Sequence, residues 1–166
     1  MSIDALLQSI QASPVAAAIR GELPGTEWLF PIVETLHVMA LTVVIGSIAM
    51  VDLRLLGLVS RSIPISRLSK EVLPWTWAAW CMAAVFGSLL FTSNARVYAG
   101  NLQFQLKFTC MALAALNMLI FQFGAFRRVE RWDSGEPARS AKAAGALSLL
   151  FWIGVVFFGR WIGFTT

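Results

Sequence analysis

Charged residues are scarce in this sequence. Asp, Glu, Lys and Arg together make up only 13% of the 166 residues, whereas 58% of the residues are hydrophobic and the mean hydropathy is +0.72. So few polar side chains cannot cover the surface of a water-soluble globule. The composition therefore excludes an ordinary soluble domain and places the chain in a lipid bilayer.

The motifs of soluble enzymes are also missing. The chain has no Gly-rich phosphate loop, no HExxH and no CxxC. A Ser-His-Asp arrangement is disfavoured because Asp52 lies about four helical turns beyond the only histidine, His37. The net charge of +4 comes from basic residues between apolar runs, not from an aromatic-interleaved basic stripe, so no nucleic-acid partner is expected.

Cysteine is rare, with only Cys81 and Cys110. On helices that cross a membrane in opposite directions, these positions differ in height by roughly 13 Å, which exceeds the Cα spacing of a disulfide. A structural disulfide within the chain is therefore not expected. Cys81 is most simply a small buried hydrophobe.

Four apolar runs dominate the sequence, at about residues 28–51, 73–92, 104–126 and 144–164. Each is close to the roughly 20 residues that a helix needs to cross a hydrocarbon core of ~30 Å. The sequence therefore predicts an all-α fold, an integral membrane four-helix transmembrane bundle occupying residues 28–166.

Residues 1–27 form a separate N-terminal segment in this prediction. They lack the basic start and continuous apolar core of a secretory signal, so we expect them to be retained. Ile3, Leu6, Leu7 and Ile10 follow helical spacing and predict a short amphipathic helix. Such a helix can lie on the membrane surface or cap the bundle, and both alternatives stay open.

The basic residues favour one side of the predicted bundle. Nine of the thirteen lie between the first and second runs or between the third and fourth, namely Arg54, Arg61, Arg67, Lys70, Arg127, Arg128, Arg131, Arg139 and Lys142. The positive-inside rule makes that side cytoplasmic. We therefore expect a multi-pass protein of the bacterial inner membrane with both termini in the periplasm.

Glu34 and His37 interrupt the first apolar run. A separation of three residues places both side chains on one face of a helix. Ionisable groups inside a membrane are costly and usually mark a functional site. We expect both side chains to be buried in the bundle.

The polar residues of the other helices fall at similar heights. With helix centres near residues 41, 85, 115 and 153, a rise of about 1.5 Å per residue gives each residue a height above the membrane midplane. His37 and Met111 fall about 6 Å toward the outer side, Arg160 about 10 Å, Lys107 about 12 Å and Arg96 about 16 Å. These heights predict a polar pocket around His37 in the outer half of the bundle.

A haem b site is the leading hypothesis for this pocket. A neutral imidazole is a common haem ligand, and basic side chains nearer the surface can hold the propionates. His37 would bind the iron, and Arg96, Lys107 and Arg160 would contact the propionates. The second axial ligand is Met111, His37 of another subunit, or absent, and the protein would serve as a redox or electron-transfer subunit with a redox partner or quinone.

Three alternatives use the same residues. Copper could bind His37 with Cys110 or Met111, because soft sulfur ligands suit Cu(I). A structural network could be formed by Glu34, His37, Asn94 and Asn117, with Glu34 paired to Arg160 or Lys107. A proton relay or small-solute channel through Glu34 and His37 is the third. We also expect a homo-oligomer, because the bundle is small and has much lipid-facing surface.

Two stretches carry a family resemblance. WLFPIVETLHVMALTVVIGSIAMVDLRLLGL and WTWAAWCMAAVFGSLLFTSNARVYAGNLQFQLKFTCMALAALNM resemble a family of four-helix bacterial membrane proteins with a domain of unknown function. More distantly, His37 in the first helix and Lys107 at the start of the third resemble the copper-resistance D-type membrane domain and the bacterial membrane protoporphyrinogen oxidases. Some of those relatives bind b-type haem, so the resemblance implies haem b at His37.

Overall fold

The computed structural model describes residues 2–60, 62–133 and 135–165. Its helices are α1 (Ile3–Gln11), α2 (Pro14–Ile19), α3 (Leu29–Leu55), α4 (Ile65–Ser93), α5 (Ala95–Gly100), α6 (Leu102–Phe123), the 3-10 helix η1 (Ala125–Arg131) and α7 (Arg139–Thr165). The described residues contain no strand, and α3, α4, α6 and α7 are long and apolar enough to cross a membrane. The all-α four-helix prediction is confirmed.

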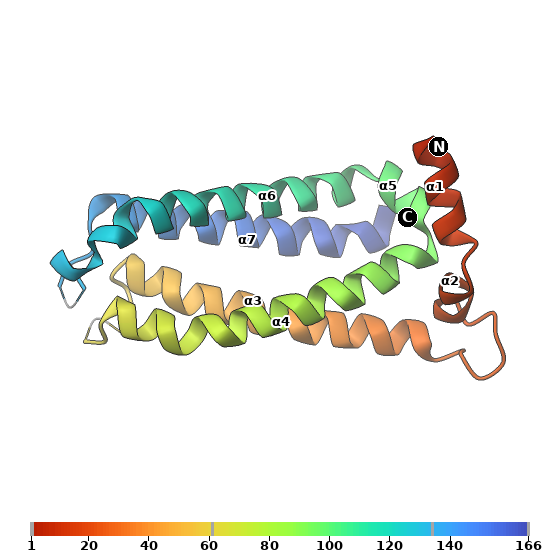
Figure 1. Cartoon of the computed structure of the whole chain (residues 1–166), viewed down its shortest axis with the longest axis horizontal. Coiled ribbons are helices and arrows are strands. Elements are labelled where there is room, and N and C mark those ends of the chain that lie inside the picture. The colour runs from red at the N-terminus through yellow and green to blue at the C-terminus, as the bar shows by residue number, and fades with distance from the viewer. Residues whose placement is uncertain (1, 61, 134, 166) are drawn as a thin grey trace.

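The four long helices form two antiparallel hairpins. α3 packs along α4, α6 packs along α7, and contacts between α3 and α7 join the two hairpins. Figure 1 shows the hairpins as two layers, with both chain termini at one end of the bundle. We call this end the outer end and the opposite end, which carries the α3–α4 and α6–α7 connections, the inner end.

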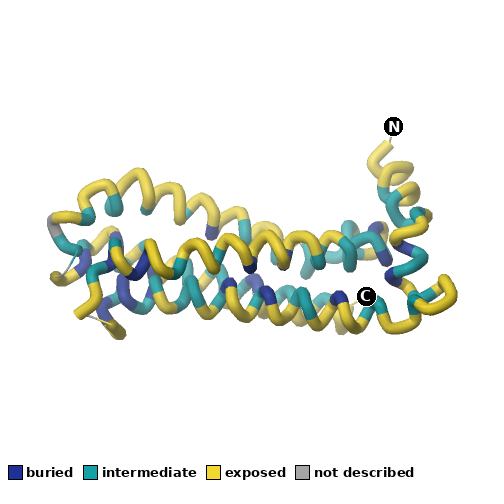
Figure 2. Tube along the Cα trace, turned by 60° about the horizontal axis from the view of Figure 1, so that its bottom comes forward, coloured by how far each residue is buried: buried dark blue, intermediate teal, exposed yellow. Residues whose placement is uncertain are grey.

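A cluster of buried hydrophobic residues lies at the inner end. Leu55, Ile65, Leu68 and Ala141 form a buried cluster contributed by α3, α4 and α7, and residues of α6 and η1 pack against it. Elsewhere the long helices expose most of their apolar side chains, as the yellow outer faces in Figure 2 illustrate. A surface this apolar suits lipid and not water.

Several helix bounds differ from the sequence-based ones. α4 begins at Ile65, not near residue 73, and runs through Pro74, whereas α7 begins at Arg139, not near residue 144. Hydropathy identifies only the part of a helix that lies in hydrocarbon. The additional first turns of α4 and α7 lie outside that part and are stabilised by the buried cluster at the inner end. α6 ends at Phe123 rather than at 126, because Gly124 leaves helical geometry with φ −100° and ψ −97°.

The inner connections are tied together by a buried arginine. Arg54 is only 1% exposed, and it donates from Nε to the carbonyl of Ile63 at 2.9 Å and from Nη2 to the carbonyl of Asp133 at 3.1 Å. The Asp133 carboxylate accepts hydrogen bonds from the Ser66 amide at 2.8 Å and the Ser66 hydroxyl at 2.5 Å. Arg54 therefore joins the two inner connections instead of facing solvent, and Arg61 lies outside the described residues.

The N-terminal segment contains two helices instead of the single one predicted. α2 packs on α4 and buries Ala16 and Ile19, so it caps the bundle. α1 lies beside α5 and leaves Ile3 and Leu6 exposed, at 78% and 45%. The segment thus combines a bundle cap with an exposed apolar face next to the membrane-spanning helices.

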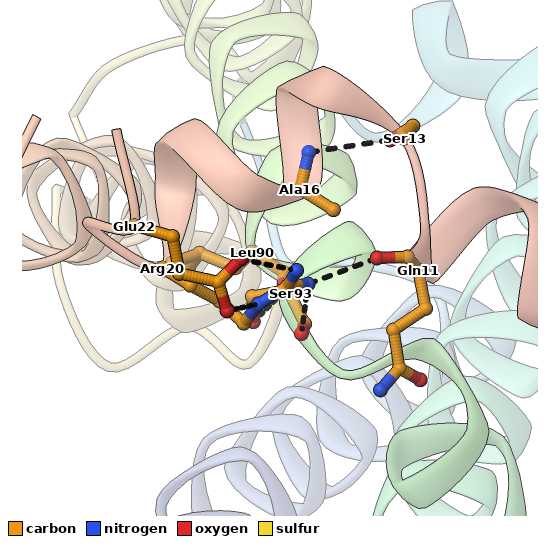
Figure 3. Close-up of polar contacts among 7 residues, drawn as sticks. All are labelled: Gln11, Ser13, Ala16, Arg20, Glu22, Leu90 and Ser93. Carbon is orange, nitrogen blue, oxygen red and sulfur yellow. Dashed lines mark hydrogen bonds and ion pairs between the residues drawn. The ribbon is translucent and has the colours of Figure 1, made fainter. Parts of the chain in front are cut away.

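Arg20 fastens this segment to α4 (Figure 3). Its guanidinium donates to both carboxylate oxygens of Glu22, at 2.6 and 2.9 Å. It also donates to the backbone carbonyls of Gln11 at 2.9 Å and Ser93 at 3.1 Å. The Arg20 hydrogen bond holds the pKa of Glu22 below its ordinary value.

Candidate functional site

His37 lies between α3 and α4 with its ring orientation fixed. It is half-buried, and its Nδ1 lies 2.8 Å from the backbone carbonyl oxygen of Ala83. Because a carbonyl only accepts, Nδ1 carries the proton in this contact, and in a neutral imidazole Nε2 keeps its lone pair. Nε2 has no hydrogen bond to a described residue, so it is available as a ligand or base.

Gly87 makes this contact possible. A Cβ at position 87 would lie 2.9 Å from His37 Cε1 and 3.3 Å from Nδ1, which is too close for a side chain to be added without displacing the ring. Gly87 is one turn beyond Ala83, so the imidazole lies directly on the α4 backbone and reaches a carbonyl that a larger residue would cover.

Lys107 contributes a positive charge from the second hairpin. It is half-buried on α6, and its Nζ lies 3.7 Å from the position that a Cβ on Gly159 of α7 would take. Its charge acts on the His37 imidazole, which places the two groups within electrostatic reach of each other. No acidic side chain in the described part of the chain forms an ion pair with Lys107.

Glu34 does not join this site. The prediction that it is buried is wrong, because the residue is exposed on α3 and forms no ion pair with Arg160 or Lys107 in the described residues. Residues three apart on a helix still differ by about 60° in direction. That difference turns His37 toward α4 and leaves Glu34 on the outside of the bundle.

The two asparagines lie elsewhere as well. Asn117 donates from Nδ2 to the carbonyl of Ala144 at 2.9 Å and so links α6 to α7. Asn94 is the residue between α4 and α5 and lines a cavity at the outer end. The expected network of Glu34, His37, Asn94 and Asn117 is therefore not formed.

Only one of the expected propionate contacts lies near His37. Arg96 is exposed on α5, where its backbone N–H donates to Gln11 Oε1 at 3.3 Å. Arg160 is exposed on α7, with its guanidinium carbon 5.1 Å from the centre of the Phe164 ring. Met111 is half-buried on α6, one turn after Lys107. Lys107 is thus the basic residue that the fold brings to His37.

Cys110 faces a different helix from His37. Cys110 Sγ lies 2.9 Å from the position that a Cβ on Gly154 of α7 would take, so it faces α7 while His37 faces α4. Cys81 is exposed, which corrects the expectation that it is buried. Within the described residues, no three His, Cys, Asp or Glu side chains are placed to hold one metal ion.

A separate buried carboxyl lies toward the inner end. Asp52 on α3 is 5% exposed, contacts the Ser148 side chain of α7, and has no hydrogen-bond partner for Oδ2 among the described residues. Fifteen residues, or about 22 Å of helix, separate it from His37. Sequence reasoning had considered Asp52 only as a possible member of a catalytic triad.

The part of the chain that contains the His37 site matches a known protein family. Residues 28–165 match the model of a "Family of unknown function (DUF6644)". No curated protein and no solved structure matches the chain. Since the match runs from the start of α3 to the end of α7 and includes His37, Gly87 and Lys107, the chain belongs to this family of unknown function.

Proposed function

We propose that this protein is a haem b-binding membrane subunit for electron transfer, with His37 Nε2 as an axial ligand of the iron. One observation carries the proposal: the Nδ1–H of His37 is engaged by the Ala83 carbonyl, 2.8 Å away. Metal-binding histidines usually donate their second ring N–H to such a group, which fixes the tautomer and orients the ring.

The positive charge of Lys107 favours the binding of an anionic group beside His37. An ionisable side chain in a membrane-spanning helix is normally paired or functional, and Lys107 has no acidic partner in the described residues. An ammonium group forms charge-assisted hydrogen bonds with carboxylates. We assign Lys107 to a haem propionate and no longer assign that role to Arg96 and Arg160, which lie elsewhere in the fold.

Haem fits this arrangement better than copper. The porphyrin supplies four nitrogens, so the protein needs to add only one or two axial ligands. A protein copper site instead needs several side chains that converge on one ion. His37 and Cys110 face different helices, α4 and α7, which disfavours their joint use.

The second axial position has two candidates in this proposal. These candidates are Met111 of the same chain, which is half-buried on α6, and a second copy of His37 in a homo-oligomer. Bound haem b supplies a one-electron redox couple, and a redox protein or quinone would exchange electrons with it. The resemblance to copper-resistance D-type and protoporphyrinogen oxidase proteins stays a prediction.

The test is an optical spectrum of the purified full chain. The protein would be prepared in detergent from haem-supplemented cells, and oxidised and reduced spectra recorded. We expect a Soret band that disappears in His37→Ala and persists in Glu34→Gln, a polar but exposed control one turn away on α3. A wild-type protein without a Soret band would contradict the proposal.

We also propose the orientation of the bundle. Nine of thirteen basic residues lie in the two connections or in the helix turns that flank them, and both termini lie at the opposite end. The positive-inside rule then places the inner end in the cytoplasm and the termini in the periplasm of a bacterial inner membrane.

A further inference from the structure

Two adjoining cavities lie at the outer end, away from His37. The larger has a volume of about 570 Å³ and is lined by residues that include Gln11, Asn94 and Tyr98. The smaller has a volume of about 410 Å³ and includes Gln8 and Arg96. Both volumes fall in the range of roughly 300–1,000 Å³ that is typical of small-ligand sites.

The wall between the cavities is joined by hydrogen bonds and is nearly neutral. Gln11, Arg20 and Glu22 line both cavities. Figure 3 shows Arg20 bound to the Glu22 carboxylate and to the backbone at Gln11 and Ser93, so its guanidinium is already occupied. The opposite charges of Arg20 and Glu22 cancel, and the hydrogen bonds of Arg20 hold the wall in place.

Arg96 provides a positive charge that is not compensated. Its guanidinium has no hydrogen bond or ion pair with a described residue, whereas its backbone N–H bonds to Gln11 Oε1 at 3.3 Å. With Arg20 balanced by Glu22, the lining carries one net positive charge. An anion is the complementary ligand.

Neutral donors surround this charge. Because Gln11 Oε1 accepts from Arg96, the amide NH₂ of Gln11 is left to donate. Gln8 lines the same smaller cavity, and its side-chain amide has no hydrogen bond to a described residue. A ligand rich in acceptor oxygens would satisfy these donors, and the planar guanidinium of Arg96 matches the geometry of a phosphate.

The position of the cavities favours phosphate over other anions. The larger cavity lies beside the first turn of α3, which contributes Phe30 to its lining, and the last turn of α4, which contributes Ser93, and the smaller cavity adjoins it. Both turns are ends of membrane-spanning helices, so the cavities face the zone of lipid headgroups. We propose that the smaller cavity binds a phosphate group, carried by a phospholipid headgroup or free in solution, through Arg96, Gln11 and Gln8. The proposal is independent of haem binding.

The experiment measures ligand-induced stabilisation of the full chain in detergent. Three probes are titrated: dioctanoyl phosphatidylglycerol, inorganic phosphate, and dioctanoylglycerol, which has similar chains and no phosphate. Thermal unfolding and native mass spectrometry report stabilisation and the number of bound molecules. Arg96→Ala and Gln8→Ala remove lining groups of the smaller cavity, and Arg160→Ala removes an exposed arginine near the outer end of α7 as the matched control.

We expect one molecule of a phosphate-bearing probe to bind and stabilise the wild type. Loss of a charge-assisted hydrogen bond should weaken binding about tenfold or more in Arg96→Ala, with a smaller loss in Gln8→Ala and none in Arg160→Ala. Binding of the phospholipid alone identifies a headgroup, and binding of inorganic phosphate identifies the free ion. Equal stabilisation by dioctanoylglycerol, equal losses in Arg96→Ala and Arg160→Ala, or no binding of either phosphate probe would overturn the proposal.

Discussion

The His37 imidazole lies against the backbone of α4 because residue 87 has no side chain. A histidine on an apolar helix could point toward lipid, toward another helix or along its own helix surface. The 2.8 Å contact with the Ala83 carbonyl selects one of these directions and fixes which ring nitrogen is free. At the scale of single residues, the candidate site thus depends on a pair, His37 and Gly87.

Gly87→Ala tests this pair directly. The new methyl group would lie 2.9 Å from the ring, so the imidazole must move and lose its Ala83 contact. We expect a weakened or shifted Soret band, with a stability loss of about 1–3 kcal/mol from overpacking. Gly46→Ala on α3, where a Cβ meets nothing within 4 Å, is the control and should leave the spectrum unchanged.

The role of Lys107 can be tested separately from that of His37 by changing the charge at position 107. Lys107→Gln removes the proposed propionate contact, and a lost charge-assisted hydrogen bond corresponds to roughly tenfold weaker haem retention. Lys107→Arg keeps the charge and should retain more haem. Haem titration of the apo-proteins gives both affinities, and equal affinities for wild type and Lys107→Gln would remove Lys107 from the site.

At the scale of elements, the two hairpins are joined where α3 crosses α7. A Cβ on Gly145 of α7 would lie 3.0 Å from the Asp52 carbonyl oxygen and 3.1 Å from Leu55 Cβ. Backbone groups cannot rotate away as a long side chain can. The small residue therefore sets how closely the hairpins approach at the inner end, beside the buried cluster.

Gly145→Ala should therefore separate α3 from α7. We expect a loss of about 1–3 kcal/mol in unfolding free energy, because the contact is with backbone and a buried Cβ. Gly163→Ala, on the same helix with nothing within 4 Å, should be neutral or gain up to about 1 kcal/mol from helix propensity. Unfolding in detergent compares the two, and equal effects would argue against a close crossing.

The N-terminal segment should respond to acid. The hydrogen bond from Arg20 lowers the pKa of Glu22 in the folded protein from its ordinary value of 4.5. As the pH falls, Glu22 of the unfolded segment therefore takes up its proton before Glu22 of the folded segment does. The stabilisation of the folded segment by the Glu22–Arg20 interaction is complete well above pH 4.5 and is lost as the pH falls through the lowered pKa. Salt should weaken it, because both groups are solvent-accessible.

Hydrogen exchange of residues 14–22 measures this release. After correction for the intrinsic exchange rate, exchange in the wild type should rise as the pH falls below about 4. The Glu22→Gln variant should already exchange faster than the wild type at neutral pH, and its exchange should not rise further in acid. An unchanged profile in Glu22→Gln would show that the α2 packing alone holds the segment.

At the scale of the whole molecule, the distribution of basic residues predicts the topology. A C-terminal fusion to alkaline phosphatase should be active and a fusion to green fluorescent protein should be dark, because both report a periplasmic terminus. Fusions placed in the α3–α4 connection should give the reverse pattern. The same fusion results at both positions would contradict the four-span topology.

The sequence alone determined the membrane setting and the four spans. Hydropathy and length suffice for both, because about 20 apolar residues have few other stable environments than a bilayer. The sequence also singled out His37 and Lys107, since rare ionisable residues are conspicuous in apolar helices. Their heights follow from helical rise, which does not depend on how the helices pack.

The direction of each side chain depended on the tertiary structure. Helical rise gives height along an axis, but rotation about that axis is set by packing between helices. Rotation exposes Glu34, turns His37 toward Gly87 and buries Arg54 against the inner connections. The cavity beside Arg96 likewise exists only because residues 8–22 fold back on α4, a long-range contact that local sequence does not encode.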